Sequence, residues 1–160
     1  MKKQFKNTEF HVNVTKVVDG DTVDVDIDLG FSTVLKKQRV RLMGIDTPES
    51  RTRDLVEKKF GKAAKAHLKM LLSGGQVTLI SHDKGKFGRI LGELFVEPPC
   101  ECGCKKKEPC LCPVVERVSA NQQMIDDAHA VAYTGENKDT TEDRHLINRQ
   151  ILIEQGTVVL

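Results

Sequence analysis

The chain has 160 residues, of which 39% are hydrophobic and 30% charged, and its formal net charge is +2. A chain of this length can bury a core without needing metals or disulfides, and its composition is that of one soluble globular domain. A charge so close to zero means that any contact with nucleic acid has to come from a local basic patch. The first residues, MKKQFKNTEF, contain lysines with no apolar run after them. We therefore expect no signal peptide, no membrane span and a cytoplasmic, reducing location.

Three strands are predicted in the first third of the chain. Residues 9–20 alternate apolar and polar side chains as far as an Asp-Gly pair, and residues 21–30 resume the alternation. Residues 32–46 form a third strand that leads into the turn DTPES. Consecutive strands of this kind predict a meander that can curl into a small barrel.

The later elements begin with a helix. Residues 55–75 carry apolar side chains at helical spacing, and two strands follow at 76–83 and 89–97. Two further helices are predicted at 119–130 and 140–156.

The order of these elements, βββ-α-ββ-α-α, predicts an α+β fold. It fits a five-stranded, partly open OB-fold barrel with three packed helices. We expect one domain over residues 1–160, with a cysteine-rich insertion at 98–113.

Five aspartates are crowded into residues 19–28. Asp24, Asp26 and Asp28 alternate with apolar residues, so we interpret them as a solvated strand face that protects an exposed sheet edge. Asp19 and Asp21 flank a glycine, where the backbone can bend. An isolated Asp-Gly-Asp would indicate only a turn.

A second acidic turn follows the third strand, and it suggests a metal site. Asp21 and Asp46 are predicted to meet at one end of the barrel. Two carboxylates and a turn carbonyl are hard oxygen ligands suited to Ca²⁺ or Mg²⁺. Arg41 and Arg89 could then clamp a phosphate group with forked hydrogen bonds.

The segments VVDGDTVDV, RVRLMGIDTPES, DKGKFGRILGELFV and HAVAY resemble the motifs of the staphylococcal nuclease (thermonuclease-like) family. They occur in the order of that family and at similar spacing, over residues 10–97 and 114–153. The resemblance implies a monomeric, calcium-dependent nuclease that hydrolyses DNA or RNA and leaves 3′-phosphate ends.

The resemblance also implies a role for each matching residue. The calcium ligands would be Asp21, Asp46 and the carbonyl of Thr47, with Asp19 behind them; Glu49 would orient or deprotonate the attacking water; Arg41 and Arg89 would bind phosphate; and Lys86, Phe87 and Tyr133 would contact a terminal phosphate and the base. Phe87 stands where the family has a tyrosine, so its ring can stack but cannot touch phosphate through a hydroxyl. His67, His129 and His145 show no ligand spacing, and we expect none of them to be catalytic.

The alternative is a catalytically silent module of the same fold that only binds nucleic acid or protein. Such a module would be expected to lose the acids and arginines, and all five are present here: Asp21, Arg41, Asp46, Glu49 and Arg89. The enzyme is therefore favoured. Because an unexported nuclease threatens its own cell, a phage or mobile-element origin is a further hypothesis.

The cysteine-rich insertion contains all five cysteines of the chain: Cys100, Cys102, Cys104, Cys110 and Cys112. Thiolates packed this closely in a reducing compartment suggest a tetrahedral, structural Zn²⁺ site. Against this, Cys-x-Cys is not the common Cys-x₂-Cys spacing. A reduced loop without metal and a disulfide-bonded loop therefore stay open as alternatives.

Overall fold

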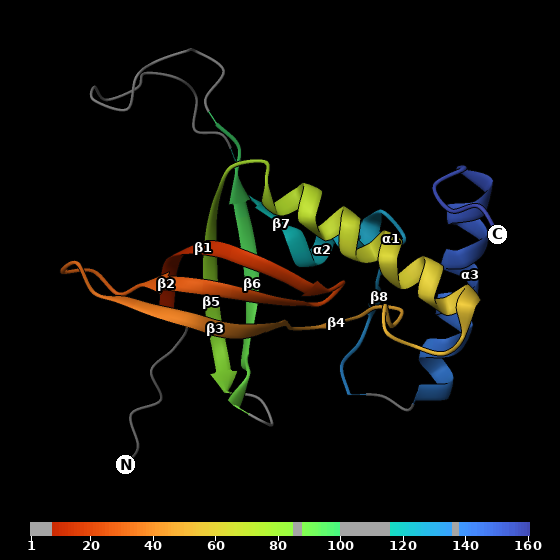
Figure 1. Ribbon diagram of the computed structural model, residues 1–160, viewed down its shortest axis with the longest axis horizontal. Coiled ribbons are helices and arrows are strands. Elements are labelled where there is room, and N and C mark those ends of the chain that lie inside the picture. Colours follow the sequence, from red (N-terminus) through yellow and green to blue (C-terminus); the bar gives the residue numbers. More distant parts are fainter. Residues whose placement is uncertain (1–7, 85–87, 100–115, 136–137) are drawn as a thin grey trace.

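The computed structural model describes residues 8–84, 88–99, 116–135 and 138–160. Its main feature is a barrel of five strands (Figure 1). The strands are β1 (Thr8–Asp19), β2 (Thr22–Asp28), β3 (Val34–Leu42), β5 (Gln76–Lys84) and β6 (Ile90–Glu97).

A parallel pairing closes this barrel. The strands follow the order β3-β2-β1-β5-β6 with antiparallel neighbours, and β3 then pairs with β6 through Val40 and Ile90, Arg41 and Leu91, and Leu42 and Gly92. The predicted α+β barrel with helices is thus confirmed, and it is closed where the sequence suggested a partly open form.

Three short strands complete the sheets: β4 (Ile45–Asp46), β7 (Val118–Ser119) and β8 (Val131–Ala132). The predicted third strand does not run unbroken to residue 46, because the backbone turns at Gly44, where φ is +78°, and β4 then pairs with β8. This turn matters for the site because it redirects the chain that carries Asp46.

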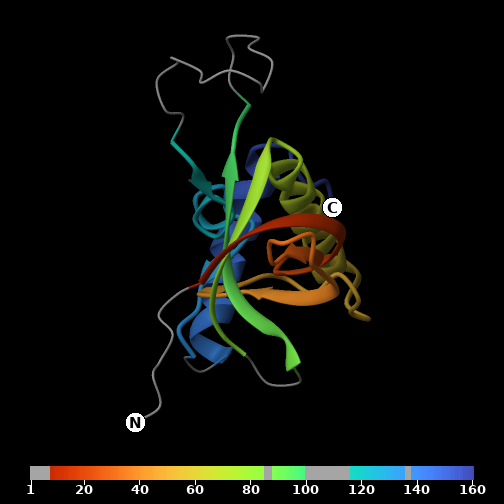
Figure 2. The same ribbon diagram turned by 90° about the vertical axis from the view of Figure 1, so that its left-hand side faces the viewer.

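The three predicted helices are α1 (Leu55–Leu72), α2 (Ala120–Asp126) and α3 (Lys138–Glu154). The side chain of Asp54 caps α1 by accepting from the backbone N–H groups of Val56 and Glu57. Ser119 caps α2 by accepting from the backbone N–H of Gln122. The helix α1 lies across the barrel beside β1, and α3 lies beyond α1 (Figures 1 and 2).

The buried apolar side chains form two clusters. The larger core fills the barrel and includes Val23, Val25 and Leu79, covered by Leu68 of α1 and Met124 of α2. A smaller cluster joins α3 to α1 and consists of Phe60, Ala128, Leu152 and Val158. Burial of these faces, rather than helix propensity, holds the helices against the barrel.

The outer aspartates of β2 lie in a different place from the one we expected. They alternate with buried residues as predicted, but β2 lies between β1 and β3, so the proposed protection of a sheet edge is wrong. Asp24 instead pairs with Arg39, and Asp26 pairs with Lys36. No helix in the described part of the chain is long and apolar enough to cross a membrane.

Candidate active site

Two carboxylates converge on one arginine at the end of the barrel. Asp21 lies in the turn between β1 and β2, Arg41 is on β3, and Asp46 is on β4. The Nη1 atom of Arg41 forms an ion pair with Asp21, and its Nη2 atom lies 3.4 Å from Oδ1 of Asp46. The structure therefore brings together the two carboxylates that were predicted to bind calcium and one of the two arginines that were predicted to bind phosphate.

Strand alternation places Arg41 on this surface. Val40 and Leu42 are almost completely buried in the core, so the side chain between them points away from it. The Arg41 side chain is still only 19% exposed. Thr22, which pairs with Arg41 across the sheet, donates a 2.8 Å hydrogen bond to Asp21. The carboxylate of Asp21 is thus held from two sides.

Two glycines let the remaining parts of the site approach. A Cβ on Gly20 would come within 2.9 Å of both Thr47 and Ala64, so only glycine lets the β1–β2 turn pack this closely. A Cβ on Gly61 of α1 would come within 2.5 Å of the Glu49 carbonyl. A glycine inside a helix costs about 0.5–1 kcal/mol relative to alanine, and here it allows α1 to hold the loop that carries Glu49.

The site carries more negative charge than its cation neutralises. Burial raises the pKa of the Asp21 carboxyl, and the charges of Asp46 and Asp19 add to this rise; together they outweigh the opposite effects of Arg41 and Thr22. Partial burial, followed by the charges of Asp19, Asp21, Asp46 and Glu57, raises the pKa of Glu49. Crowded carboxylates of this kind are typical of sites that take up a cation or exchange a proton.

The donor set fits a hard cation such as Ca²⁺. Asp21 and Asp46 offer carboxylate oxygens, and Thr47 is buried against the turn that carries Asp21. Among the described residues, no three His, Cys, Asp or Glu side chains lie close enough to hold a metal by themselves. A calcium ion would therefore also need a backbone carbonyl, water and substrate oxygens, which its flexible shell accepts.

His145 belongs to this site, although no motif or spacing in the sequence predicts it there. Its Nε2 atom lies 3.1 Å from Oδ2 of Asp46, whereas Arg41 approaches the other carboxylate oxygen, Oδ1. His145 comes from α3, and 99 residues separate it from Asp46. It also borders a hollow of about 310 Å³ together with Asp46, Glu49 and Glu57. Local sequence spacing carries no signal for a contact of this separation.

The other predicted residues lie at varying positions around this centre. Arg89 lines a hollow with Asp24, Lys37 and Arg39, just before the part of β6 that pairs with β3. The backbone N–H of Tyr133 donates to Gly44, next to the pairing of β4 with β8. The structure thus places Tyr133 beside the short strand that carries Asp46, whereas Arg89 lies with Asp24 and Arg39 of the outer face.

Some predicted residues lie outside the described part of the chain. These are Lys86, Phe87 and the five cysteines at 100, 102, 104, 110 and 112. Their contacts to substrate and to Zn²⁺ stay predictions.

Comparison with known proteins gives a consistent picture. A family model described as "Staphylococcal nuclease homologue" matches residues 39–152. A protein named Thermonuclease from Staphylococcus intermedius is 36% identical over 86 residues, which are 52% of this chain and 47% of that protein. Endonuclease YncB from Bacillus subtilis is 36% identical over 98 residues, which are 58% of this chain and 43% of that protein.

A third relative is an uncharacterized endonuclease from Escherichia coli, 31% identical over 87 residues, covering 54% of this chain and 49% of that protein. The chain spans about half or less of the length of each of these relatives. Asp19 and Asp21 precede the residues that the family model matches, so their place in the site rests on the geometry described above.

Proposed function

The chain belongs to the staphylococcal nuclease homologue family, and from this premise we propose that it is a calcium-dependent nuclease that hydrolyses phosphodiester bonds of DNA or RNA. The observation that carries the proposal is the arrangement of Asp21 and Asp46 on either side of the Arg41 guanidinium. Three of the groups that the chemistry needs thus already lie together at one end of the barrel.

The proposed roles follow from the charges. Arg41 has two ends of its guanidinium turned toward the acids, and a cation bound between Asp21 and Asp46 would free this guanidinium for a phosphate oxygen. Calcium, when bound, neutralises negative charge that builds up on the phosphorus oxygens in the transition state. Arg41 and Arg89 add fixed positive charge there, and removal of one such group typically costs about 10²–10³ in rate.

Glu49 is the proposed proton acceptor. Its raised pKa makes it a better base than an ordinary carboxylate, and general bases contribute about 10²–10⁴ in rate. Water would form a bond to phosphorus while its proton passes to Glu49, and the P–O5′ bond would break. The proton taken up by Glu49 would then return, through solvent, to the leaving 5′-oxygen. The products of this direction of cleavage are a 3′-phosphate end and a 5′-hydroxyl end.

The test is cleavage of end-labelled single-stranded DNA and RNA by purified protein in Ca²⁺, in Mg²⁺ and in chelator. We expect cleavage in Ca²⁺, little in Mg²⁺ and none in chelator. Analysis of the product ends checks for 3′-phosphate. Glu49→Gln, purified in the same way, is the matched control for contaminating nucleases. Full activity in chelator would contradict the metal requirement, and binding without cleavage in every condition would favour the silent module.

A further inference from the structure

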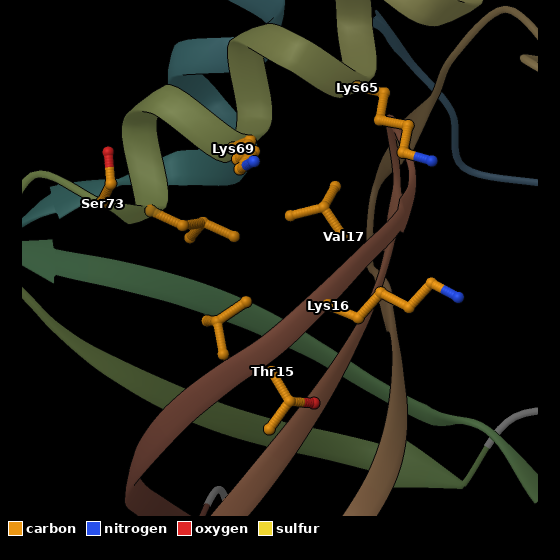
Figure 3. Close-up of a pocket in the computed structure, with 8 residues that line it drawn as sticks. Thr15, Lys16, Val17, Lys65, Lys69 and Ser73 are labelled. Carbon is orange, nitrogen blue, oxygen red and sulfur yellow. The ribbon is translucent and has the colours of Figure 1, made fainter.

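A groove on another part of the surface runs between β1 and α1. Its floor is apolar and consists of Val14, Val17 and Leu72, and its volume is about 400 Å³. Three lysines line it: Lys16 from β1, and Lys65 and Lys69 from α1. Figure 3 shows Lys16 and Lys65 on opposite sides, with their amino groups extending toward the same edge of the groove. Thr15 and Ser73 complete the lining, so none of the described residues that line the groove is acidic.

The positive charge of this groove is not neutralised by salt bridges. Within the ranges that the structure describes, none of the three lysines forms an ion pair. Asp24 is close enough to Lys16 to interact electrostatically, but both of its oxygens already accept from Arg39, at 2.8 and 3.0 Å. Three unpaired ammonium groups around one groove leave a surface that attracts anions.

A row of lysines on α1 extends from the groove toward the part of the helix that packs against the Glu49 loop. Lys58, Lys62, Lys65 and Lys69 are spaced by four, three and four residues, so they share one side of the helix. Gly61, in the same part of α1, packs against the loop of Glu49. With a rise of about 1.5 Å per residue, the helix covers about 12 Å from Gly61 to Lys69. The lysine-bearing side of α1 therefore extends from the helical turn that packs against the Glu49 loop to the groove.

The chemistry of the groove matches a nucleic-acid backbone. Lysines act as point charges for phosphates without demanding a fixed geometry, and the valine and leucine floor can cover the apolar faces of sugars or bases. No aromatic ring lines the groove, so strong stacking is absent and recognition would not depend on sequence. We propose that this groove binds the single-stranded nucleic acid that flanks the cleaved phosphodiester. The inference rests on the proposed nuclease function, which it extends by a second contact region.

The first test measures binding in chelator, where no cleavage is expected. Fluorescence anisotropy gives the affinity for labelled oligonucleotides of about 4 and about 16 nucleotides, which is the range bound by single OB-type barrels. The variant is Lys65→Gln/Lys69→Gln. The matched control is Lys36→Gln/Lys59→Gln, which removes two lysines outside the groove. Thermal unfolding of both variants checks that they are folded.

We expect the long oligonucleotide to bind wild type more tightly than the short one, and this advantage to be lost in the groove variant alone. The slope of log affinity against log salt should become less steep by about 1.4, because each lost phosphate contact on a single strand removes about 0.7. Equal binding by the groove variant and the control would overturn the inference. Equal affinity of wild type for polyglutamate would also overturn it, since the groove would then suit any acidic chain.

A second measurement needs no variant. Acetylation of wild-type protein, followed by mass spectrometry, should show that the long oligonucleotide protects Lys16, Lys65 and Lys69 more than Lys36 and Lys59. Uniform protection or none would count against the groove. The two proposals fail separately: protection without cleavage in Ca²⁺ would refute the nuclease function alone, and cleavage with no protection would refute the groove alone.

Discussion

Asp21 and Asp24 lie three residues apart in the chain, yet their carboxyl groups have opposite surroundings. Burial raises the pKa of Asp21, and the neighbouring Asp46 and Asp19 reinforce the effect. The hydrogen bonds from Arg39 lower the pKa of Asp24. Asp26, two residues further on, has its pKa lowered by the backbone N–H of Lys37 and the side chain of Lys36. The β1–β2 turn and strand β2 thus carry two kinds of aspartate.

This difference shows where the protein tolerates an unfavourable charge. On the outer face of β2, each of the first two aspartates has its own cation from β3, and the pairs add little beyond solubility and register. At the end of the barrel, Asp21 and Asp46 share a single arginine. Asp21 and Asp46 therefore have less positive charge around them than Asp24 and Asp26 do. We would expect this shortage of positive charge at a site that binds a cation.

The largest expected effect separates the two kinds of aspartate by activity. Asp21→Asn should lower the rate of nucleic-acid cleavage by on the order of 10²–10³, because it removes a charged ligand at the reacting phosphate. Asp24→Asn should leave the rate unchanged. Initial rates in Ca²⁺ check both variants. If Asp24→Asn lowered the cleavage rate more than Asp21→Asn, the distinction between these two aspartates would be wrong.

The partners of these aspartates should differ in the same way. Arg41→Lys keeps the charge but loses the planar fork, so we expect about a hundredfold loss of activity, and Arg89→Lys should also be impaired. Arg39 donates hydrogen bonds to Asp24, so the Arg39→Lys variant should cleave nucleic acid at the wild-type rate. The same initial-rate assay compares the three variants. Normal turnover in Arg41→Lys would identify Arg41 as a structural residue.

His129 extends the comparison to a basic group that is buried. Burial lowers its pKa to about 4, and the stacked ring of His67, with centroids 4.2 Å apart, contributes to the same effect. The nearby Asp127 opposes it. The folded state therefore binds a proton on His129 less readily than the unfolded state, whose histidine titrates near 6.5. The stability that neutral His129 provides is complete above pH 6.5 and is lost as the pH falls toward 4.

By pH 5 this loss should reach about 2 kcal/mol. Urea unfolding between pH 7 and pH 5 measures it in wild type. His129→Gln should show a flatter dependence, whereas His11→Gln, which changes an exposed histidine on β1, should follow wild type. A wild-type slope that survives in His129→Gln would assign the effect to another group.

The smallest expected effect concerns the paired aspartates. Asp24→Asn should reduce the free energy of unfolding by less than about 1 kcal/mol, since its partner Arg39 is half-exposed and water screens the pair. The lowered pKa of Asp24 means that this contribution is present above pH 3.8 and disappears as the pH falls below it. High salt should shrink the difference between Asp24→Asn and wild type. A loss several times larger would show that the pair supports the barrel itself.

Much of this arrangement could be predicted because it is encoded locally. The alternation of apolar and polar residues along β2 and β3 predicts that Val23 and Val40 face the core and that Arg41 faces away from it, and the structure agrees. Gly61 also carries information in the sequence. A glycine inside a helix lowers the stability of the helix, so its presence in α1 indicates a close neighbour, which the structure identifies as the Glu49 loop.

The remainder depends on contacts between distant parts of the chain. The closing pair of β3 with β6 joins Arg41 to Leu91, and two-residue strands such as β4 and β8 are too short to show periodicity. The position of β2 between two neighbours, which corrected our interpretation of its aspartates, is likewise a property of the closed sheet. His145 illustrates the limit most clearly, because nothing near it in the sequence refers to Asp46.

The contact between His145 and Asp46 also sets an order of events during synthesis. A chain is made from its N-terminus, so Asp21, Arg41 and Asp46 leave the ribosome well before α3. Until α3 arrives and folds back over 99 residues, Asp46 has Arg41 as its partner but not the imidazole that holds its second oxygen. A nascent or prematurely ended chain therefore carries the acids of the site before it carries the residue that holds one of them, and α3 completes the geometry that the hairpin of β1 and β2 begins.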